Sequence, residues 1–243
     1  MSSPTRLSVN VDHVATLREA RGVGYPDPLE AARISEAAGA QGITIHLRQD
    51  RRHIQEEDLY SIRDHVRGKL NLEMSTEQEM IEIAVRVRPH QVTLVPERPE
   101  EVTTEGGLDL GTQLGRVRDA ARALDTAGIR VSLFLDPDLR QIDRLNELGN
   151  DLVPGFEINT DAYSRARADG IALELEKIRG VAGRGSNLGF QVFAGHGLTV
   201  ANVGPVSSLA PIEELNIGHS VVSRAVLIGM EAAVLELLEA MRQ

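Results

Sequence analysis

The sequence predicts a (β/α)8 barrel, because short aliphatic or β-branched runs alternate with longer stretches of helical period along its 243 residues. The eight predicted strands begin near Leu7, Gly42, Leu70, Gln91, Arg130, Phe156, Phe190 and Glu214. Each interval between strand starts can hold one crossover helix, as a parallel sheet requires. Repetition and length together predict a single α/β domain over residues 1–243. Spacing alone leaves an open, doubly wound sheet as the alternative.

Helix boundaries are marked by capping residues in three places. A cap precedes a helical run at Asp27-Pro28 with Glu30, at Ser75 with Gln78, and at Asp136-Pro137. The final helix is expected over roughly residues 220–241, where apolar residues recur near helical spacing. Residues 183–189 are glycine-rich but precede a strand and lack the spacing of a dinucleotide-binding motif, so a loop is expected there.

Composition excludes several classes of function. Cysteine is absent, which excludes disulfides, thiolate metal sites and a cysteine nucleophile. A formal net charge of −10 and an aromatic content of 3% argue against nucleic-acid binding and anionic membranes, which favour basic or stacking surfaces. No apolar run is long enough for a membrane span or a signal peptide. The sequence therefore predicts a cytoplasmic protein without nucleic-acid or membrane partners.

Histidines gather at the carboxyl ends of the predicted strands. His13, His46, His53, His196 and His219 lie at or just beyond a strand end, whereas His65 ends a helix and His90 precedes a strand. Because the active site of an α/β barrel forms at the carboxyl ends of its strands, the first five are expected to share one rim. Imidazole exchanges protons near neutral pH, so this cluster suits a reaction with several proton transfers. The other two histidines are expected to be structural.

Two carboxylates add candidate acids and bases to the same rim. Glu73 and Glu157 each lie on a predicted strand among apolar neighbours and are expected to point into the barrel. Burial there would raise the pKa of each carboxyl group. A buried structural ion pair is the alternative for both, because inward charges are costly unless they are paired.

Two regions suit the binding of phosphate. Residues 194–198 and 216–220 follow the seventh and eighth strands, where glycine-exposed N–H groups and a helix N-terminus bind anions. A basic cluster of Arg48, Arg51, Arg52 and His53 follows the second strand, and guanidinium groups match phosphate oxygens bidentately. A solvated surface is the alternative for Arg52. Two anion sites would require two phosphorylated ligands or one bisphosphate. No metal site is expected, because no histidine and carboxylate have helical ligand spacing.

The connection at residues 96–108 is longer than a barrel needs. Its Gly106-Gly107 pair could serve as the hinge of a lid over the active site. A tolerated surface loop is the alternative.

Motifs from Leu7 to the final helix resemble the pyridoxine 5′-phosphate synthase family. They are VNVDHVATLR (9–18), YPDP (25–28), TIHLR (44–48), DRRH (50–53), NLEM (71–74), LVPE (94–97), VTTEGG (102–107), AGHGL (194–198) and LNIGH (215–219). The resemblance covers nearly the whole chain, and its motifs in combination are highly specific.

The resemblance implies a transferase-class synthase of vitamin B6 biosynthesis. It would condense 1-deoxy-D-xylulose 5-phosphate with 3-amino-2-oxopropyl phosphate, giving pyridoxine 5′-phosphate, inorganic phosphate and water. By motif match, His46 and Glu73 would accept protons, His196 would donate one and Glu157 would stabilise charged intermediates. The family also implies a homo-oligomer, an octamer.

The same motifs imply which residues would hold the two phosphorylated substrates. Asp12, His13, Arg48, His53 and Thr103 would bind the deoxyxylulose phosphate, and Asn10, Arg21, Gly197, Gly218 and His219 would bind the aminoketone phosphate. Because the substrate supplies the amine for imine formation, neither a catalytic lysine nor a cofactor is expected. The only lysines are Lys69 and Lys177, and Lys69 lies at the wrong end of its strand.

The chain departs from the family at three positions. Asn159 and Asp161 replace the histidine and glycine of the usual Glu-Ile-His-Thr-Gly motif, which puts the local loop geometry in doubt. Phe193 stands where the family usually has asparagine, and either packing or substrate contact could change there. Two other functions remain open at this stage. One is a phosphosugar isomerase or aldolase with one phosphate site, and the other is a barrel that binds a phosphometabolite without turnover.

Overall fold

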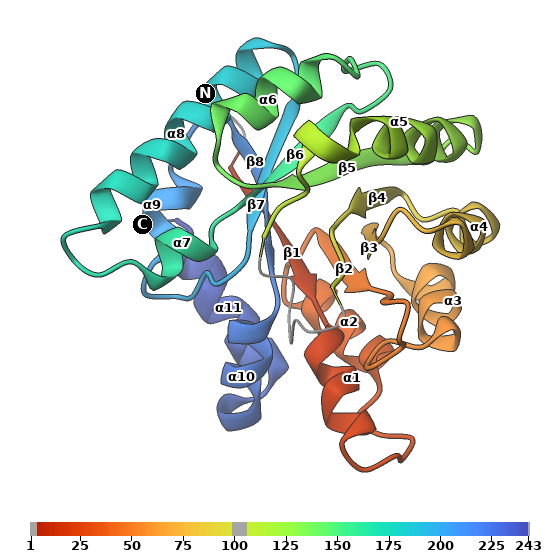
Figure 1. Cartoon of the computed structure of the whole chain (residues 1–243). Helices are drawn as coiled ribbons and strands as arrows, with labels where there is room; N and C mark the ends of the chain where they lie inside the picture. The colour runs from red at the N-terminus through yellow and green to blue at the C-terminus, as the bar shows by residue number, and fades with distance from the viewer. Residues whose placement is uncertain (1–3, 99–105, 243) are drawn as a thin grey trace.

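Eight parallel strands hydrogen-bond in chain order and close into a barrel, because β8 pairs with β1 as well as with β7 (Figure 1). The computed structural model describes residues 4–98 and 106–242. The strands are β1 (Arg6–Asn10), β2 (Gly42–His46), β3 (Lys69–Met74), β4 (Gln91–Leu94), β5 (Arg130–Leu135), β6 (Gly155–Asn159), β7 (Gln191–Gly195) and β8 (Ile212–Ile217). Every strand starts within two residues of its predicted start. The predicted (β/α)8 barrel is therefore confirmed, and the open sheet is excluded.

Helices surround the barrel, and some strands are followed by two of them. They are α1 (Asp12–Glu19), α2 (Pro28–Ala37), α3 (Glu56–His65), α4 (Gln78–Val87), α5 (Leu110–Thr126), α6 (Leu139–Asn146), α7 (Asp161–Arg165), α8 (Ile171–Asn187), α9 (Val203–Ser207), α10 (His219–Ile228) and α11 (Met230–Ala240). Within the described ranges, no helix has both the length and the hydropathy needed to cross a membrane. The short helix α1 begins directly after β1, so its first turn lies at the carboxyl-end rim.

Successive side chains along each strand point alternately toward the surrounding helices and toward the barrel axis. The face toward the helices is apolar, and the barrel interior is polar. In β3, Leu70 and Leu72 are fully buried in the apolar core that the helices cover. Asn71 lies between them and faces the barrel axis, where it donates to Thr44 Oγ1 (3.4 Å) and accepts from Thr93 Oγ1 (2.9 Å). The interior is thus held by hydrogen bonds between strands, and it offers polar surroundings to the acids above it.

The amino-terminal end of the barrel is closed by an ion pair and an aromatic ring. Lys69 begins β3 and pairs with Glu214, and its ammonium lies 4.8 Å from the centroid of the Phe193 ring. The prediction that Lys69 lies away from the active-site rim is confirmed. Phe193 is 2% exposed and its ring packs close to Gly155, so its role is packing below the rim.

Two predicted helix caps are wrong, although the helices exist. Asp27 caps α2 as predicted, accepting from Leu29 N (2.8 Å). The helix expected after Ser75 is preceded by Glu77 as N-cap, and the Ser75 hydroxyl accepts both from Glu77 N (3.4 Å) and from Gln49 Nε2 (3.1 Å). Asp138, rather than Asp136, caps α6. In both cases the side chain that local spacing assigned to the cap also contacts another part of the barrel.

Two predicted boundaries in the second half of the chain are also wrong. Residues 183–187, expected to form a loop, continue α8, where Gly185 allows close packing: a Cβ on it would lie 2.3 Å from Phe156 Cε1. The expected final helix is divided into α10 and α11 at Gly229, whose φ of 85° ends the first helix. Val226 is 66% exposed as a result.

Candidate active site

A cavity of about 540 Å³ opens at the carboxyl ends of the strands. Among the described residues, all predicted site residues except Arg21 line it: Asn10, Asp12, His13, His46, Arg48, His53, Glu73, Glu157, His196, Gly197, Gly218 and His219. The five histidines expected at one rim therefore meet around one cavity. His65 ends α3 and His90 precedes β4, as predicted, and neither lines the cavity.

One described residue that was predicted to bind substrate, Arg21, does not line this cavity. Arg21 lies exposed in the turn after α1. Thr103 lies outside the described residues, as does most of the predicted lid at 96–108. The described end of that connection is packed against the end of β5, since Leu108 N donates to Phe134 O (2.8 Å). A Cβ on Gly107 would lie 2.3 Å from Asp136 N, so close packing explains this glycine without a hinge.

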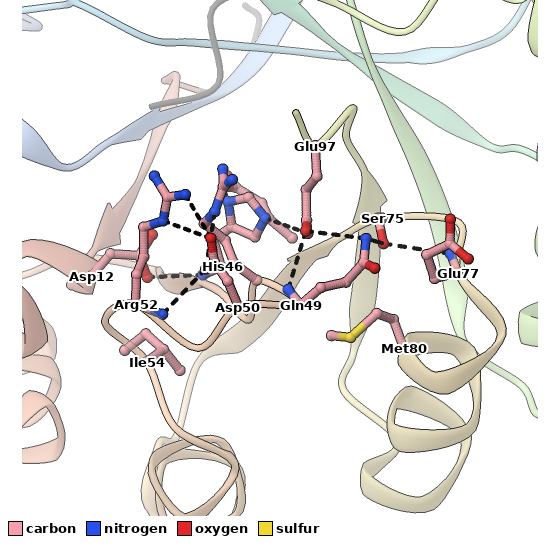
Figure 2. Close-up of polar contacts among 12 residues, drawn as sticks. Asp12, His46, Gln49, Asp50, Arg52, Ile54, Ser75, Glu77, Met80 and Glu97 are labelled. Carbon is pink, nitrogen blue, oxygen red and sulfur yellow. Dashed lines mark hydrogen bonds and ion pairs between the residues drawn. The ribbon is translucent and has the colours of Figure 1, made fainter. Parts of the chain in front are cut away.

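His46 is the last residue of β2, and Figure 2 shows it in contact with Asp12 and Glu97. Its backbone N–H donates to Asp12 Oδ1 (2.8 Å), and its ring Nε2 lies 3.0 Å from Glu97 Oε1. The strand register sets His46 beside Glu73 on β3, with 4.0 Å between Nδ1 and Oε2. An imidazole and a carboxyl group therefore face the cavity side by side.

The surroundings of Glu73 favour the protonated form of its carboxyl group over the ionised form. Burial raises the pKa of Glu73 well above its ordinary value, and the nearby carboxyl groups of Glu157 and Asp12 raise it further. The raised pKa extends to higher pH the range in which Glu73 carries a proton; the protonated carboxyl group can donate, and the carboxylate can accept. The predicted rise in pKa is confirmed for this residue.

Glu157 on β6 has a raised pKa for a similar reason. Burial raises the pKa of Glu157 to about 8, with the Glu214 carboxylate adding to the rise, while a hydrogen bond from Asn216 and the charge of Lys69 oppose it. Asn216 Nδ2 donates to Glu157 Oε2 at 2.5 Å. The side chain fits because Gly195 has no Cβ, which would lie 2.4 Å from Glu157 Oε1. Glu157 thus titrates near physiological pH.

His196 follows β7 with a backbone φ of 84°, in the left-handed region that β-carbon sterics disfavour. Its Nε2 lies 3.6 Å from Asp161 Oδ1, the same oxygen that accepts from Arg165 Nε (2.8 Å). The imidazole therefore reaches the cavity next to a carboxylate that is already paired with an arginine.

Burial favours the neutral form of two further rim histidines, His13 and His53. Burial lowers the pKa of His13 and of His53, and the Asp12 carboxylate opposes this in both cases. The His13 and His219 rings meet edge to face, with centroids 5.2 Å apart. Neutral imidazoles can donate one hydrogen bond and accept another, which suits the hydroxyl and phosphate groups of a sugar phosphate.

The predicted anion regions after β7 and β8 depend on close packing of their glycines. Gly197 has a φ of 75°, and a Cβ on it would lie 2.1 Å from Ser164 Oγ. A Cβ on Gly218 would lie 2.9 Å from Asn10 Cβ. Gly218 precedes α10, whose first backbone N–H groups lie at the cavity. These features provide donors for an anion on this side of the cavity.

The basic cluster after β2 is only partly directed at the cavity. Arg48 is 3% exposed, and its Nε has no hydrogen-bond partner among the described residues, although Asp50 Oδ1 lies 3.5 Å away. Arg52 lines the cavity but is paired with Asp50. Arg51 is turned away and pairs with Glu56 and Glu79. Arg48 is therefore the best-placed cation for an anion on this side.

Comparison with known proteins assigns the chain to a family. The sequence profile described as "Pyridoxal phosphate biosynthesis protein PdxJ" matches residues 7–243. The chain belongs to this family. A pyridoxine 5′-phosphate synthase from Synechococcus sp. is 52% identical over 236 residues, which cover 97% of this chain and 98% of that protein. One from Trichlorobacter lovleyi is 51% identical over 239 residues, covering 98% and 99%.

Solved structures of more distant proteins share the fold. A thiamine phosphate pyrophosphorylase from Pyrococcus furiosus superposes with a TM-score of 0.63 at 14% identity, covering 98% of this chain and 95% of that one. A phosphoribosylanthranilate isomerase from Thermotoga maritima gives 0.60 at 14% identity, covering 98% of each. These similarities support the barrel architecture alone.

The PdxJ-family departures after β6 form an ordered turn. Asn159 Nδ2 donates to Asp136 Oδ1 (2.9 Å), and Asn159 Oδ1 accepts from Asp161 N (3.0 Å). The second of these bonds is an Asx-type turn, which asparagine readily forms. The replaced motif therefore keeps a defined geometry next to Glu157.

Three residues could supply ligand atoms to a metal ion. One atom each from Asp12, His46 and Glu73 lies within 4.8 Å of the others. Asp12 already accepts from His46 N and from Asn10 Nδ2, both at 2.8 Å. Both Asp12 oxygens therefore already accept hydrogen bonds, and the raised pKa of Glu73 disfavours the ionised carboxylate that would bind a metal. These three residues favour hydrogen bonding over ligation of a metal.

Several cavity residues were not predicted to belong to the site. They are Thr16, Val95, Phe134, Asp161, Ser164, Arg165 and Thr199. The cavity is also lined by Leu198, Asn216, Ile217 and Ser220, which belong to the predicted anion regions 194–198 and 216–220. Phe134 gave no usable signal in the sequence, because its strand neighbours are equally apolar.

Proposed function

We propose that this cavity joins 1-deoxy-D-xylulose 5-phosphate to 3-amino-2-oxopropyl phosphate, releasing inorganic phosphate and water and giving pyridoxine 5′-phosphate. Family membership makes the chain an enzyme of vitamin B6 biosynthesis, and its curated relatives are pyridoxine 5′-phosphate synthases. The observation that carries the proposal is the meeting of His46, Glu73, Glu157 and His196 around one cavity. Imine formation, elimination and ring closure each need a proton acceptor or donor.

The proposed roles follow the protonation states of these groups. His46 accepts a proton from substrate, and Glu73, whose raised pKa strengthens its carboxylate as a base, accepts another. His196 donates a proton to a leaving oxygen. Glu157, with a pKa of about 8, exchanges between neutral and charged forms near physiological pH and stabilises positive charge on the imine nitrogen.

The substrates are proposed to bind on the two sides of β1. The deoxyxylulose phosphate would contact Asp12, His13, Arg48, His53 and Thr103, with buried Arg48 as the phosphate donor. The aminoketone phosphate would contact Asn10, Gly197, Gly218 and His219, where glycines and the start of α10 supply N–H groups. A role for Arg21 remains a prediction, because its side chain lies outside the cavity.

We further propose a homo-oligomer of one-domain barrels, located in the cytoplasm. Exposed apolar side chains on neighbouring helices support association: Leu17 on α1 is 48% exposed and Leu227 on α10 is 76% exposed (Figure 1). The octamer follows from family resemblance alone. Light scattering on the purified protein would measure the stoichiometry, and a monomer at micromolar concentration would contradict the proposal.

A two-substrate assay tests the reaction directly. Purified protein with both phosphates is expected to release inorganic phosphate and to form a product with the absorbance of pyridoxine phosphate, whereas either substrate alone gives neither. Calorimetric titration should find a separate site for each phosphate. Folded protein that binds both substrates without product would overturn the proposal in favour of a binding protein. Turnover of a single phosphosugar would favour an isomerase or aldolase.

A further inference from the structure

The carboxylate of Glu97 forms the closest side-chain contact to the His46 ring. Glu97 follows β4 by three residues, and Figure 2 shows its side chain directed at that ring, 3.0 Å from Oε1 to Nε2. The two side chains are only 5% and 6% exposed. A hydrogen bond between buried polar groups is costly to break, because each would be left without a partner.

The second oxygen of Glu97 is fixed as well. Glu97 Oε2 accepts from Gln49 N (3.1 Å) and from Gln49 Nε2 (3.4 Å), and Gln49 Nε2 also donates to Ser75 Oγ (3.1 Å). Next to it, Arg98 O accepts from Arg48 Nη2 (3.3 Å). The segment after β4 is thus attached to the segment after β2 at two successive residues, which leaves the Glu97 carboxylate little freedom to turn.

Charge makes Glu97 a hydrogen-bond acceptor. Burial alone would raise the pKa of Glu97, but the hydrogen bonds from His46 and Gln49 and the nearby charge of Arg48 lower it. An ionised carboxylate can only accept, so His46 must place a proton on Nε2. In the neutral ring the lone pair is then on Nδ1, the nitrogen that lies 4.0 Å from Glu73 Oε2.

We propose that Glu97 is a positioning residue that holds His46 in the Nε2-protonated tautomer, so that Nδ1 is the atom that takes up the proton. The inference rests on the proposed role of His46 as proton acceptor. Histidine bases commonly depend on such a partner on the far ring nitrogen to fix both tautomer and ring angle.

Glu97→Gln is the decisive variant. Its amide can present either oxygen or NH₂ to Nε2, so it no longer selects one tautomer. We expect kcat to fall roughly 10- to 100-fold, below the loss from removing a base itself, with both KM values within about threefold. Glu97→Asp, which keeps the charge on a shorter side chain, should lose less than Glu97→Gln.

A spectroscopic measurement on the ligand-free enzyme determines the tautomer of His46 independently of the catalytic rate. ¹⁵N spectra of the protein labelled at its seven histidines report which ring nitrogen carries the proton, and the His46 signal is assigned by its loss in His46→Asn. The wild type should show Nε2–H, and Glu97→Gln should show a mixture or Nδ1–H.

Glu77→Gln is the matched control. Glu77 lies nearby in Figure 2, but its carboxylate is 46% exposed and pairs with Arg116. This variant should leave kcat and the His46 spectrum unchanged. An unchanged His46 spectrum in Glu97→Gln would overturn the positioning role, even in a slower enzyme. A changed spectrum with wild-type kcat would overturn the assignment of His46 as proton acceptor, and the inference with it.

Discussion

The two histidines proposed to move protons are held in different ways. His46 ends a regular strand, and both its backbone and its ring make hydrogen bonds of 3.0 Å or less to buried carboxylates. His196 has a backbone φ of 84°, and the carboxylate beside it lies 3.6 Å away and is shared with Arg165. The side chain of His46 is also less exposed, at 6%, than that of His196, at 25%.

This difference indicates how the two sides of the cavity are organised. On the side of β2, β3 and β4, buried hydrogen bonds set the orientation of the proton acceptor within the protein itself. On the side of β6 and β7, the donor has a left-handed backbone and a longer, more solvated contact with Asp161. Variants on the first side should therefore lose more activity than matched variants on the second.

The largest effect is expected from removing the acceptor. His46→Ala or Glu73→Gln should slow turnover by roughly 10²-fold or more, the usual scale for a general acid or base, without loss of folding. Steady-state kinetics give kcat, and circular dichroism checks the fold. His65→Ala, at the exposed end of α3, is the matched control and should keep wild-type rates. Near-normal turnover in Glu73→Gln would count against its role.

An effect on stability is expected from Glu157. Its pKa is raised from 4.5 to about 8, so the folded state binds this proton more tightly than the unfolded state. The resulting stability is present below the unfolded pKa and is lost as pH rises through about 8.

Glu157→Gln removes this pH dependence. At pH 9 the variant should be more stable than the wild type by about 1–3 kcal/mol, with a smaller difference at pH 5. Thermal unfolding at both pH values measures it, and exposed Glu147→Gln is the control. A difference that is independent of pH would show that Glu157 is not held protonated.

The smallest effect is expected at Asp161. Because its pair with His196 is long and partly solvated, Asp161→Asn should lower kcat by less than about fivefold, in line with exposed ion pairs. Arg165→Gln is a useful companion variant, because it removes the arginine that shares the Asp161 carboxylate with His196. A loss of kcat in Asp161→Asn as large as that in Glu97→Gln would contradict the expected difference between the two sides of the cavity.

Local sequence signals failed where distant side chains competed for the same groups. Ser75 and Asp136 have the residue type and spacing of helix caps. In the folded chain, however, Ser75 accepts from Gln49, and Asp136 accepts from Gly107 N and Asn159 Nδ2. Such contacts join residues that are far apart in sequence, so capping rules could not anticipate them.

The sequence by itself determined the barrel and most of its rim. Strand periodicity fixed which side chains face inward, and the carboxyl ends of parallel strands necessarily meet, so His46, Glu73, Glu157 and His196 could be placed together in advance. Only the tertiary structure decided which groups touch. The β2–β3 register puts His46 beside Glu73, and the path of the chain after β4 brings Glu97 to the other ring nitrogen. The reason is physical: periodicity specifies direction, whereas contact at 3 Å and the pKa values that follow depend on burial and neighbours contributed by several strands.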